Sequence, residues 1–174
     1  MKILVTGANG QLGNEIKERI AQFVAWEFVF CDAKELDIVD LVAVKNYIKS
    51  NSIQVIINCA AYTAVDKAEE DQELCHAVNV TGAKNLALAA VEYNCRYIHT
   101  STDFVFDGHY HLPYKETDKP KPLSVYGATK LQGEVEVLKL LPEAIVLRTA
   151  WLYSVHGGNF VKTMQRLGTE REHL

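Results

Sequence analysis

The chain has 174 residues, of which 48% are hydrophobic and 23% charged, a composition typical of one soluble globular domain. Its formal net charge is -4 and it has no run of basic residues, which disfavours nucleic acid and anionic membranes as partners and favours a small-molecule ligand. No leader-like pattern opens the sequence and no apolar run approaches membrane-spanning length, so we expect a cytoplasmic protein.

The first thirteen residues predict a strand, a tight turn and the start of a helix. The apolar run 3–5 is typical of a buried parallel strand, and Gly7, Gly10 and Gly13 follow it at three-residue spacing. In such a turn Gly7 permits the sharp bend, Gly10 lets the backbone approach a pyrophosphate, and Gly13 lets the helix lie close to the strand. A glycine-rich surface turn is the alternative. The preferred interpretation is a dinucleotide site.

An acidic residue closes the next expected strand. Asp32 follows the apolar run 28–31, about 20 residues after the last glycine, where nucleotide folds place a carboxylate for the adenosine ribose. A carboxylate there accepts hydrogen bonds from the ribose hydroxyls and repels a 2′-phosphate, so NADH is favoured. Lys34, two residues on, offsets that charge and keeps NADPH open.

Strands and helices alternate along the chain. Short apolar runs predict strands, and apolar residues at helical spacing predict helices. Three of the four prolines fall within 101–123, which lacks a helical period and is expected to be an ordered loop over the strand ends. The expected strands cover residues 3–5, 28–31, 55–57, 96–100 and 144–147, and the helices cover 12–22, 41–48, 71–94 and 125–141, with a last helix from about 159.

This alternation predicts an α/β fold, a Rossmann-type doubly wound parallel sheet with helices on both faces. Its ligand crevice is expected at the carboxyl ends of the strands. Small residues such as Ala61 follow the third strand and leave room for a cofactor, and Gly82 is a candidate for close packing against another element.

The cysteines and histidines show no metal-site spacing. Cys31, Cys59, Cys75 and Cys95 form no C-x-x-C pair, and three of them lie in or beside apolar runs, so we expect buried free thiols and a reducing compartment. No H-E-x-x-H pair is present. We therefore expect no protein-bound catalytic metal.

Tyr126 and Lys130 lie four residues apart at the start of an expected helix, one turn apart on the same face. Alone, the pair is more simply interpreted as surface helix residues, but Ser101, Thr102 and Asp103 end the fourth strand and are expected to bring hydroxyls to the crevice mouth. In reduction of a carbonyl, a phenol can donate a proton to the oxygen as hydride reaches the carbon. A neighbouring ammonium is expected to lower the phenol pKa from about 10. Thr102 can donate to the same oxygen.

Five segments together resemble dTDP-4-dehydrorhamnose reductases, which are extended short-chain dehydrogenase/reductases, in this order and close to this spacing. The segments are Thr6–Gly13, Asn58–Glu69, Thr100–Gly108, Val125–Glu134 and Arg148–Tyr153. The resemblance spans nearly the whole chain. It implies reduction of the 4-keto group of dTDP-4-dehydro-β-L-rhamnose with NADH or NADPH, a step towards dTDP-rhamnose and cell-surface polysaccharides such as lipopolysaccharide.

The resemblance also implies a role for each matching residue. Thr102, Tyr126 and Lys130 match the catalytic trio; Gly10, Gln11 and Leu12 match the pyrophosphate loop; Asp37 and Ile38 match positions near adenine; Ala61, Tyr62, Thr63 and Thr100, with Tyr126 and Lys130, line the nicotinamide side; and Thr63, Val65, Thr102, Asp103, Phe104 and Trp151 face the deoxysugar nucleotide. Asp37 is equally well interpreted as a capping or solvated acid, and Trp151 as a core aromatic after a strand.

Members of that family continue for roughly another hundred residues that form a small substrate domain. We therefore expect residues 1–174 to be the NAD(P)-binding Rossmann domain, with the small C-terminal substrate domain absent from this chain. Two other classes remain open: a non-catalytic regulatory relative, such as a methionine adenosyltransferase regulatory subunit, and a nucleotide-sugar dehydratase or epimerase. Asp103 is followed by Phe104 rather than by the Glu of dehydratases. A homodimer is also left open.

Overall fold

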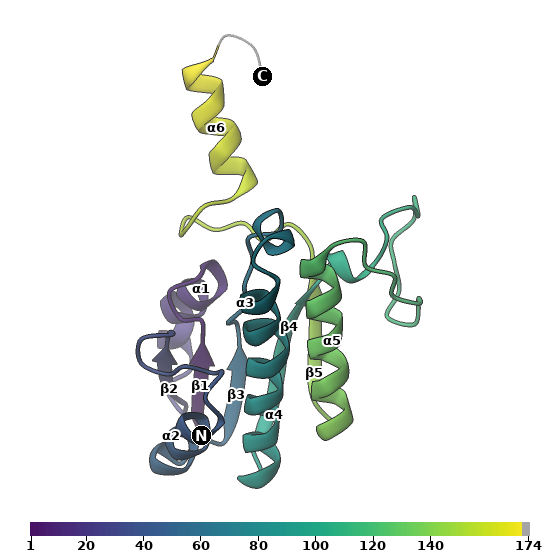
Figure 1. Ribbon diagram of the computed structural model, residues 1–174. Coiled ribbons are helices and arrows are strands. Elements are labelled where there is room, and N and C mark those ends of the chain that lie inside the picture. The colour runs from purple at the N-terminus through teal and green to yellow at the C-terminus, as the bar shows by residue number, and fades with distance from the viewer. Residues whose placement is uncertain (172–174) are drawn as a thin grey trace.

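A computed structural model describes residues 1–171, so residues 172–174 of the expected domain lie outside the described part of the chain. Five parallel strands form one sheet in the order β2-β1-β3-β4-β5. This confirms the expected Rossmann-type parallel sheet (Figure 1). The strands are β1 (Lys2–Thr6), β2 (Glu27–Cys31), β3 (Val55–Asn58), β4 (Arg96–Thr102) and β5 (Ile145–Thr149).

Helices cover both faces of the sheet, as expected. They are α1 (Gln11–Arg19), α2 (Leu41–Asn51), α3 (Gln72–His76), α4 (Ala83–Glu92), α5 (Val125–Leu140) and α6 (Phe160–Glu170). The larger core cluster joins one face of the sheet to α2, α4 and α5 through residues such as Leu4, Ile56, Val44, Leu86 and Val137. The smaller cluster joins Ile3, Val5 and Val55 to Ile16 of α1 on the other face.

Hydrophobic burial fixes these layers because the strands are apolar on both faces, as a parallel sheet requires. Leu4, Val5 and Ile56 have no exposed surface. On β5, by contrast, Ile145 and Leu147 are 54% and 48% exposed. Burial of the sheet is therefore tightest around β1 and β3, next to the glycine-rich turn.

The expected long helix 71–94 is interrupted. A π-helical turn, Ala77–Gly82, separates α3 from α4. Asn79 in this turn is buried and hydrogen-bonds to side chains and backbone outside its own helix, which explains why regular α-helical pairing is locally given up. Gly82 does pack closely, as expected, since a Cβ atom there would lie 2.5 Å from Ile38 Cδ1.

Other element ends differ by a few residues. The first helix ends at Arg19 and continues as a 3₁₀ turn, Ile20–Gln22. Strand β4 runs two residues beyond the expected end, to Thr102, and a 3₁₀ turn, Asp103–Val105, follows where a loop was expected. Helix α6 begins where expected, but none of its residues is buried, and Figure 1 shows it extending beyond the carboxyl end of the sheet.

The strand order places a topological switch point between β1 and β3. From β1 the chain moves to β2 on one side, and from β3 it continues to β4 and β5 on the other. In open α/β sheets, ligands bind outside the carboxyl ends of the strands at such a point. The strand order therefore keeps the ligand crevice expected at the ends of β1 and β3, where the glycine turn meets the small residues after β3.

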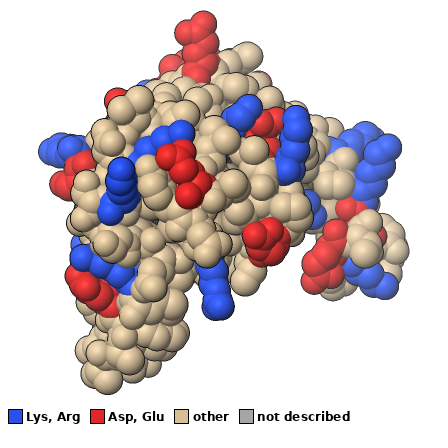
Figure 2. Space-filling model, turned by 90° about the horizontal axis from the view of Figure 1, so that it is seen from below, with Lys and Arg blue, Asp and Glu red and all other residues tan. Residues whose placement is uncertain are grey.

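The opposite end of the molecule is shown in Figure 2. Lysine and arginine residues are interspersed there with acidic residues, and neither sign forms a continuous patch. Within residues 1–171, no helix combines the length and the hydropathy needed to cross a membrane.

Candidate active site

The glycine-rich turn forms a tight cradle between β1 and α1. Gly7 has a φ of +65°, and a Cβ atom on it would lie 2.6 Å from the Ala60 backbone nitrogen. A Cβ atom on Gly13 would lie 2.5 Å from the Gly7 carbonyl oxygen. Gly10 is the N-cap of α1 and provides no side-chain cap, so the N–H groups of the first turn, including those of Gln11 and Leu12, are available to an anion. The cradle therefore fits a pyrophosphate.

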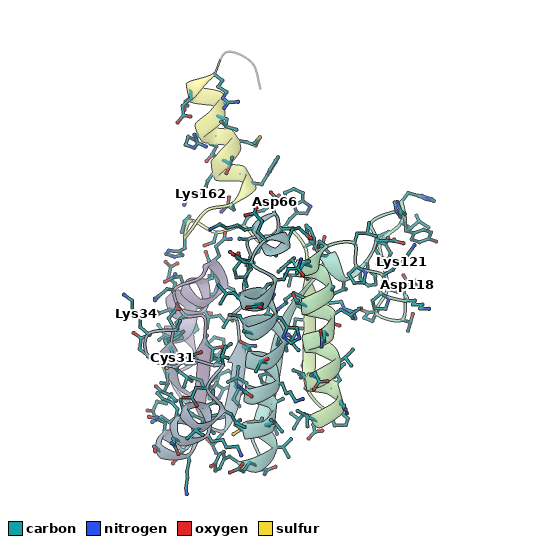
Figure 3. The ribbon with its side chains drawn as sticks, viewed as in Figure 1. Cys31, Lys34, Asp66, Asp118, Lys121 and Lys162 are labelled. Carbon is teal, nitrogen blue, oxygen red and sulfur yellow. The ribbon has the colours of Figure 1, made fainter. Side chains whose placement is uncertain are left out.

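Asp32 lies beside this cradle. One carboxylate oxygen accepts a hydrogen bond from the Asn9 N–H at 2.9 Å, and the other accepts one from the Ala33 N–H at 2.7 Å. The carboxylate is thereby held at the end of β2, where the ribose of a dinucleotide bound to the cradle is expected. Lys34 is exposed on the loop just beyond Cys31, at the outer edge of the sheet (Figure 3).

The residues matched to adenine are placed differently from each other. Asp37 is exposed and accepts a hydrogen bond from the Val39 N–H at 2.9 Å, which agrees with its alternative interpretation as a solvated acid, whereas the N-cap of α2 is Asp40. The Ile38 side chain is buried against Gly82, and its carbonyl accepts a hydrogen bond from Asn85 at 3.0 Å. The side chain of Ile38 therefore serves the core, and its assignment to adenine remains a prediction.

A buried polar network supports the cradle from below. The Thr6 hydroxyl donates to Asn58 Oδ1 at 2.7 Å, and the same oxygen accepts from the Ala60 N–H at 3.1 Å, so the ends of β1 and β3 are joined. The Asn58 amide also lies 3.2 Å from His99 Nδ1. His99 is 1% exposed, its Nε2 has no partner within the described residues, and burial lowers its pKa to about 3.

The segment after β3 is held by the π-helical turn. The side chain of Asn79 accepts a hydrogen bond from the Tyr62 N–H at 2.9 Å and donates one to the Tyr62 carbonyl at 3.2 Å. It also donates to the Thr129 hydroxyl on α5 at 3.2 Å. One asparagine therefore ties the segment containing Ala61, Tyr62 and Thr63 to the helix that carries the predicted catalytic pair.

The predicted catalytic residues are brought together. Thr102, Tyr126 and Lys130 are 6%, 9% and 2% exposed, and each belongs to β4 or α5. The Lys130 ammonium donates to the Thr100 carbonyl at 2.7 Å. The ring of Phe104 lies 5.6 Å from that of Tyr126 in an edge-on arrangement. Residues distant in the sequence thus form one cluster at the carboxyl end of β4.

The pKa of Tyr126 differs from what its position beside Lys130 led us to expect. Burial raises the pKa of Tyr126, and a hydrogen bond with Thr102 acts in the opposite direction. The expected lowering by Lys130 is not found, because the ammonium is directed at the Thr100 carbonyl. Burial also lowers the pKa of Lys130 to about 8, and the charge of Glu134 opposes that change.

The Ser101 hydroxyl was expected at the mouth of the crevice, but it points to α5 instead. Its hydroxyl donates to the carboxylate of Glu134, a buried residue on α5. Glu134 in turn binds Arg148 on β5, with the shortest of three contacts at 2.6 Å. Neither residue was assigned a role from the sequence. The signal that could have identified Glu134 is its spacing, since it continues the stripe formed by Tyr126 and Lys130 at four-residue intervals.

Most of the residues matched to the sugar nucleotide lie at the surface, but Thr102 is buried. Thr63 and Asp103 are exposed, Val65 is half-buried and Phe104 is 44% exposed. Trp151 is 64% exposed and contacts the Phe160 ring edge-on at 5.1 Å, so the core interpretation of this residue is wrong. These positions leave the side chains accessible to a ligand, and their assignment to the substrate remains a prediction.

The cysteines are free thiols, with three buried and Cys59 half-buried. Within the described part of the chain, one group of side chains could hold a metal ion: Glu15, Glu18 and His156. Glu15 is already paired with Arg19, and Glu18 with His156 at 2.6 Å. None of the three belongs to the predicted catalytic cluster.

Comparisons with known proteins identify the family of this chain. The sequence model of the family described as "RmlD substrate binding domain" matches residues 1–174. The dTDP-4-dehydrorhamnose reductase of Aggregatibacter actinomycetemcomitans is 45% identical over 173 residues, covering 99% of this chain and 59% of that protein. This chain therefore spans less than two thirds of the length of that relative.

Two solved structures are similar in sequence and fold. The dTDP-4-dehydrorhamnose reductase of Clostridium acetobutylicum has a TM-score of 0.96 and 46% identity, over 100% of this chain and 61% of that one. The enzyme of the same name from Bacillus anthracis, solved in complex with NADP, has a TM-score of 0.94 and 40% identity, over 98% of this chain and 60% of that one.

Proposed function

Because the chain belongs to the RmlD substrate binding domain family, we propose that it carries the cofactor site and catalytic residues of an NADH- or NADPH-dependent reductase. The substrate is dTDP-4-dehydro-β-L-rhamnose, whose 4-keto group is reduced to give dTDP-β-L-rhamnose. The observation that carries the proposal is the burial of Thr102, Tyr126 and Lys130 in one cluster at the crevice. The names of relatives at 45% and 46% identity support the choice of substrate.

The cradle and the residues around it suit a dinucleotide. The first turn of α1 presents N–H groups and a positive dipole end to the pyrophosphate, and Asp32 meets the adenosine ribose. A bound nicotinamide dinucleotide supplies the hydride. Ala61, Tyr62, Thr63 and Thr100 border the nicotinamide side, where Asn79 fixes the Tyr62 backbone. Complexation of the Bacillus anthracis relative with NADP supports this class of cofactor.

Thr102, Tyr126 and Lys130 act together in the transfer of a proton to the substrate. Tyr126 donates its phenolic proton to the carbonyl oxygen of the substrate, and Thr102 donates a hydrogen bond to the same atom. Since burial raises the pKa of Tyr126, a phenolate formed there needs a compensating positive charge. Lys130 lies one helical turn away and would provide that charge by turning from the Thr100 carbonyl towards Tyr126. General acid catalysis of this kind contributes about 10²–10⁴-fold to the rate.

The wider setting follows from the same proposal. Val65, Asp103, Phe104 and Trp151 would contact the deoxysugar nucleotide, with Trp151 offering an apolar ring face. The product would serve synthesis of cell-surface polysaccharide, including lipopolysaccharide. Free thiols suit a cytoplasmic location. The proposal is compatible with a homodimer and does not require one.

Two measurements test the proposal. Fluorescence titration of residues 1–174 with NADH should give saturable binding, because every residue assigned to the cofactor lies within them. Oxidation of NADH and NADPH should then be followed for the protein in its full natural length, with a panel of dTDP- and UDP-4-keto-6-deoxysugars. Turnover is expected to be fastest with dTDP-4-dehydro-β-L-rhamnose.

The outcomes separate the alternatives. Failure to bind either dinucleotide would contradict the cofactor assignment. Binding without oxidation by any member of the panel would replace the proposal with a non-catalytic regulatory role. Release of water or a change of epimer without net oxidation would favour a dehydratase or an epimerase.

A further inference from the structure

Glu134 is a buried carboxylate in the middle of α5. It is 2% exposed, although acidic side chains are almost never fully buried unless they are paired. It lies one helical turn after Lys130 and two turns after Tyr126, so all three face the sheet. A buried charge on the catalytic stripe calls for an explanation beyond packing.

The partners of Glu134 lie on two strands. Arg148 Nε contacts the two carboxylate oxygens at 3.0 and 3.2 Å, and Arg148 Nη2 contacts Oε2 at 2.6 Å. The Ser101 hydroxyl donates to Oε1. The Arg148 guanidinium also lies 5.1 Å from the centre of the Phe106 ring. The carboxylate thus joins α5 to the carboxyl ends of both β4 and β5.

Glu134 and Lys130 bind consecutive residues of β4. Lys130 donates to the carbonyl of Thr100 at 2.7 Å, while Glu134 accepts from the hydroxyl of the next residue, Ser101. Two side chains one turn apart on the helix therefore fix one point of the strand, directly before Thr102. A shift of α5 along β4 would break both contacts together.

Among the charges around Lys130, that of Glu134 has the largest effect on its pKa. Burial lowers the pKa of Lys130, and Glu134 is the largest influence that raises it, followed by the thiols of Cys59 and Cys75. His99, on β4, stays neutral near pH 7 because burial lowers its pKa to about 3. Arg148 forms an ion pair with Glu134 at 2.6 Å.

We propose that Glu134 is a positioning residue of the active site, which keeps Lys130 directed at Thr100 and sets a negative charge one helical turn from it, while Arg148 and Ser101 hold the carboxylate in place. The catalytic part of this statement rests on the proposed reductase function. Its electrostatic part does not, because it concerns the charge state of Lys130 in the folded chain.

The contacts of Glu134 predict that two substitutions shift the pKa of Lys130 in opposite directions. Glu134→Gln removes the negative charge that raises the pKa of Lys130 and leaves the Arg148 guanidinium unpaired, so the pKa of Lys130 should fall by about one unit or more. Arg148→Gln leaves the Glu134 carboxylate without its cation, so the pKa of Lys130 should rise. Glu136→Gln is the matched control, since Glu136 lies on the same helix and pairs with Lys84 at 2.8 Å.

The experiment is a pH titration of lysine side chains by NMR in isotopically labelled protein. The Lys130 signal is assigned by its loss in Lys130→Met, and thermal unfolding checks that each variant is folded. We expect opposite shifts in Glu134→Gln and Arg148→Gln and none in Glu136→Gln. A role in stability alone would lower the melting temperature of both variants without opposed shifts, and that result would overturn the proposal.

The pH dependence of kcat in the full natural length provides the catalytic readout. The alkaline limb should follow Lys130, moving to lower pH in Glu134→Gln and to higher pH in Arg148→Gln, while KM for NADH changes little. If the alkaline limb of the kcat profile does not move with the pKa of Lys130 measured by NMR, the catalytic part of the proposal is overturned. Opposed NMR shifts in a protein that reduces none of the sugars would contradict the proposed function and leave the electrostatic role of Glu134 standing.

Discussion

The carboxylate of Asp32 accepts a hydrogen bond from the backbone N–H of Asn9 at 2.9 Å, which joins the end of β2 to the glycine-rich turn after β1. The same carboxylate accepts a second backbone hydrogen bond, from Ala33. These two bonds prevent the side chain from swinging away from a ligand. The negative charge therefore stays in place whichever dinucleotide binds.

This fixed charge predicts the cofactor preference. NADH should bind at least as tightly as NADPH, because the carboxylate repels a 2′-phosphate. Asp32→Asn keeps an acceptor for the Asn9 N–H but removes the charge, and should improve binding of NADPH relative to NADH by roughly fivefold, given about 1 kcal/mol for a solvated pair of charges at this range. Fluorescence titration with both cofactors measures the ratio.

Glu27→Gln is the control for that variant, because Glu27 lies at the other end of β2 and pairs with Lys2 at 2.8 Å. If wild-type protein binds NADPH tightly and NADH not at all, the preference is wrong and the exposed Lys34 becomes the candidate ligand of the 2′-phosphate.

Removal of the Tyr126 hydroxyl should separate binding from chemistry. In Tyr126→Phe the cradle and the Lys130 contact to Thr100 remain, so the affinity for NADH should be nearly unchanged. The kcat of the full natural length should fall by about 10²–10⁴-fold, because the proton donor is lost. Steady-state kinetics and NADH titration give the two quantities, with Tyr93→Phe as a control. A kcat above about a tenth of the wild-type value would contradict the proton-donor assignment.

The contact between Gly13 and the preceding turn predicts a large effect from a single methyl group. In Gly13→Ala the new Cβ atom would lie 2.5 Å from the Gly7 oxygen and 2.7 Å from Ala8 Cα. These are backbone atoms, so the cradle must open. We expect a loss of about 1–3 kcal/mol in the free energy of unfolding and at least a tenfold weaker affinity for NADH.

The matched control is Gly168→Ala in α6, where a Cβ atom would have no neighbour within 4 Å. That change should stabilise the helix slightly, by up to about 1 kcal/mol, and leave NADH binding unchanged. Equal effects of the two variants on NADH affinity, measured by titration, would show that the cradle is not the binding site.

His99 should make the fold sensitive to acid. Burial lowers its pKa from the ordinary 6.5 to about 3, so between these two pH values the unfolded chain binds a proton that the folded chain excludes. The free energy of unfolding should therefore fall as the pH decreases through this window, by up to about 1.4 kcal/mol per pH unit from this group.

Denaturant unfolding between pH 7 and pH 4 tests this dependence. His99→Gln keeps a polar partner for Asn58 but cannot titrate, so its slope against pH should be shallower than that of the wild type. His76→Gln, which changes an exposed histidine on α3, should leave the slope as it is. Identical slopes for the wild type and His99→Gln would contradict the assignment.

The sequence predicted best those features that depend on local patterns. Apolar runs such as 3–5 and 55–57 identify buried parallel strands, and the spacing of Gly7, Gly10 and Gly13 identifies a tight strand-to-helix turn, because each is set by neighbouring residues. The positions of Tyr126 and Lys130 on one helical face could be predicted for the same reason.

Features that depend on distant contacts were missed. Glu134 has the appearance of an ordinary charged residue on a helix, and only the approach of Arg148 and Ser101 makes its burial possible. The π-helical turn at Asn79 was likewise not predicted, because the sequence shows one continuous helical pattern there. The Asn79 side chain binds the Tyr62 backbone, which lies in a different segment of the chain. The charge state of a buried group cannot be assessed before its partners are known.

The π-helical turn also limits how the length of this chain can change. Its i→i+5 hydrogen bonds enclose one more residue than an α-helical turn does, so deletion of one residue from Ala77–Gly82 would restore a continuous α-helix. Because the π-turn already accommodates that extra residue, the deletion would leave Leu86 and Ala90 facing the sheet, but it would withdraw Asn79 from Tyr62. We therefore expect the fold to tolerate insertions and deletions in the exposed loop 108–112. Between Gln72 and Glu92 a change in the number of residues should disrupt the structure.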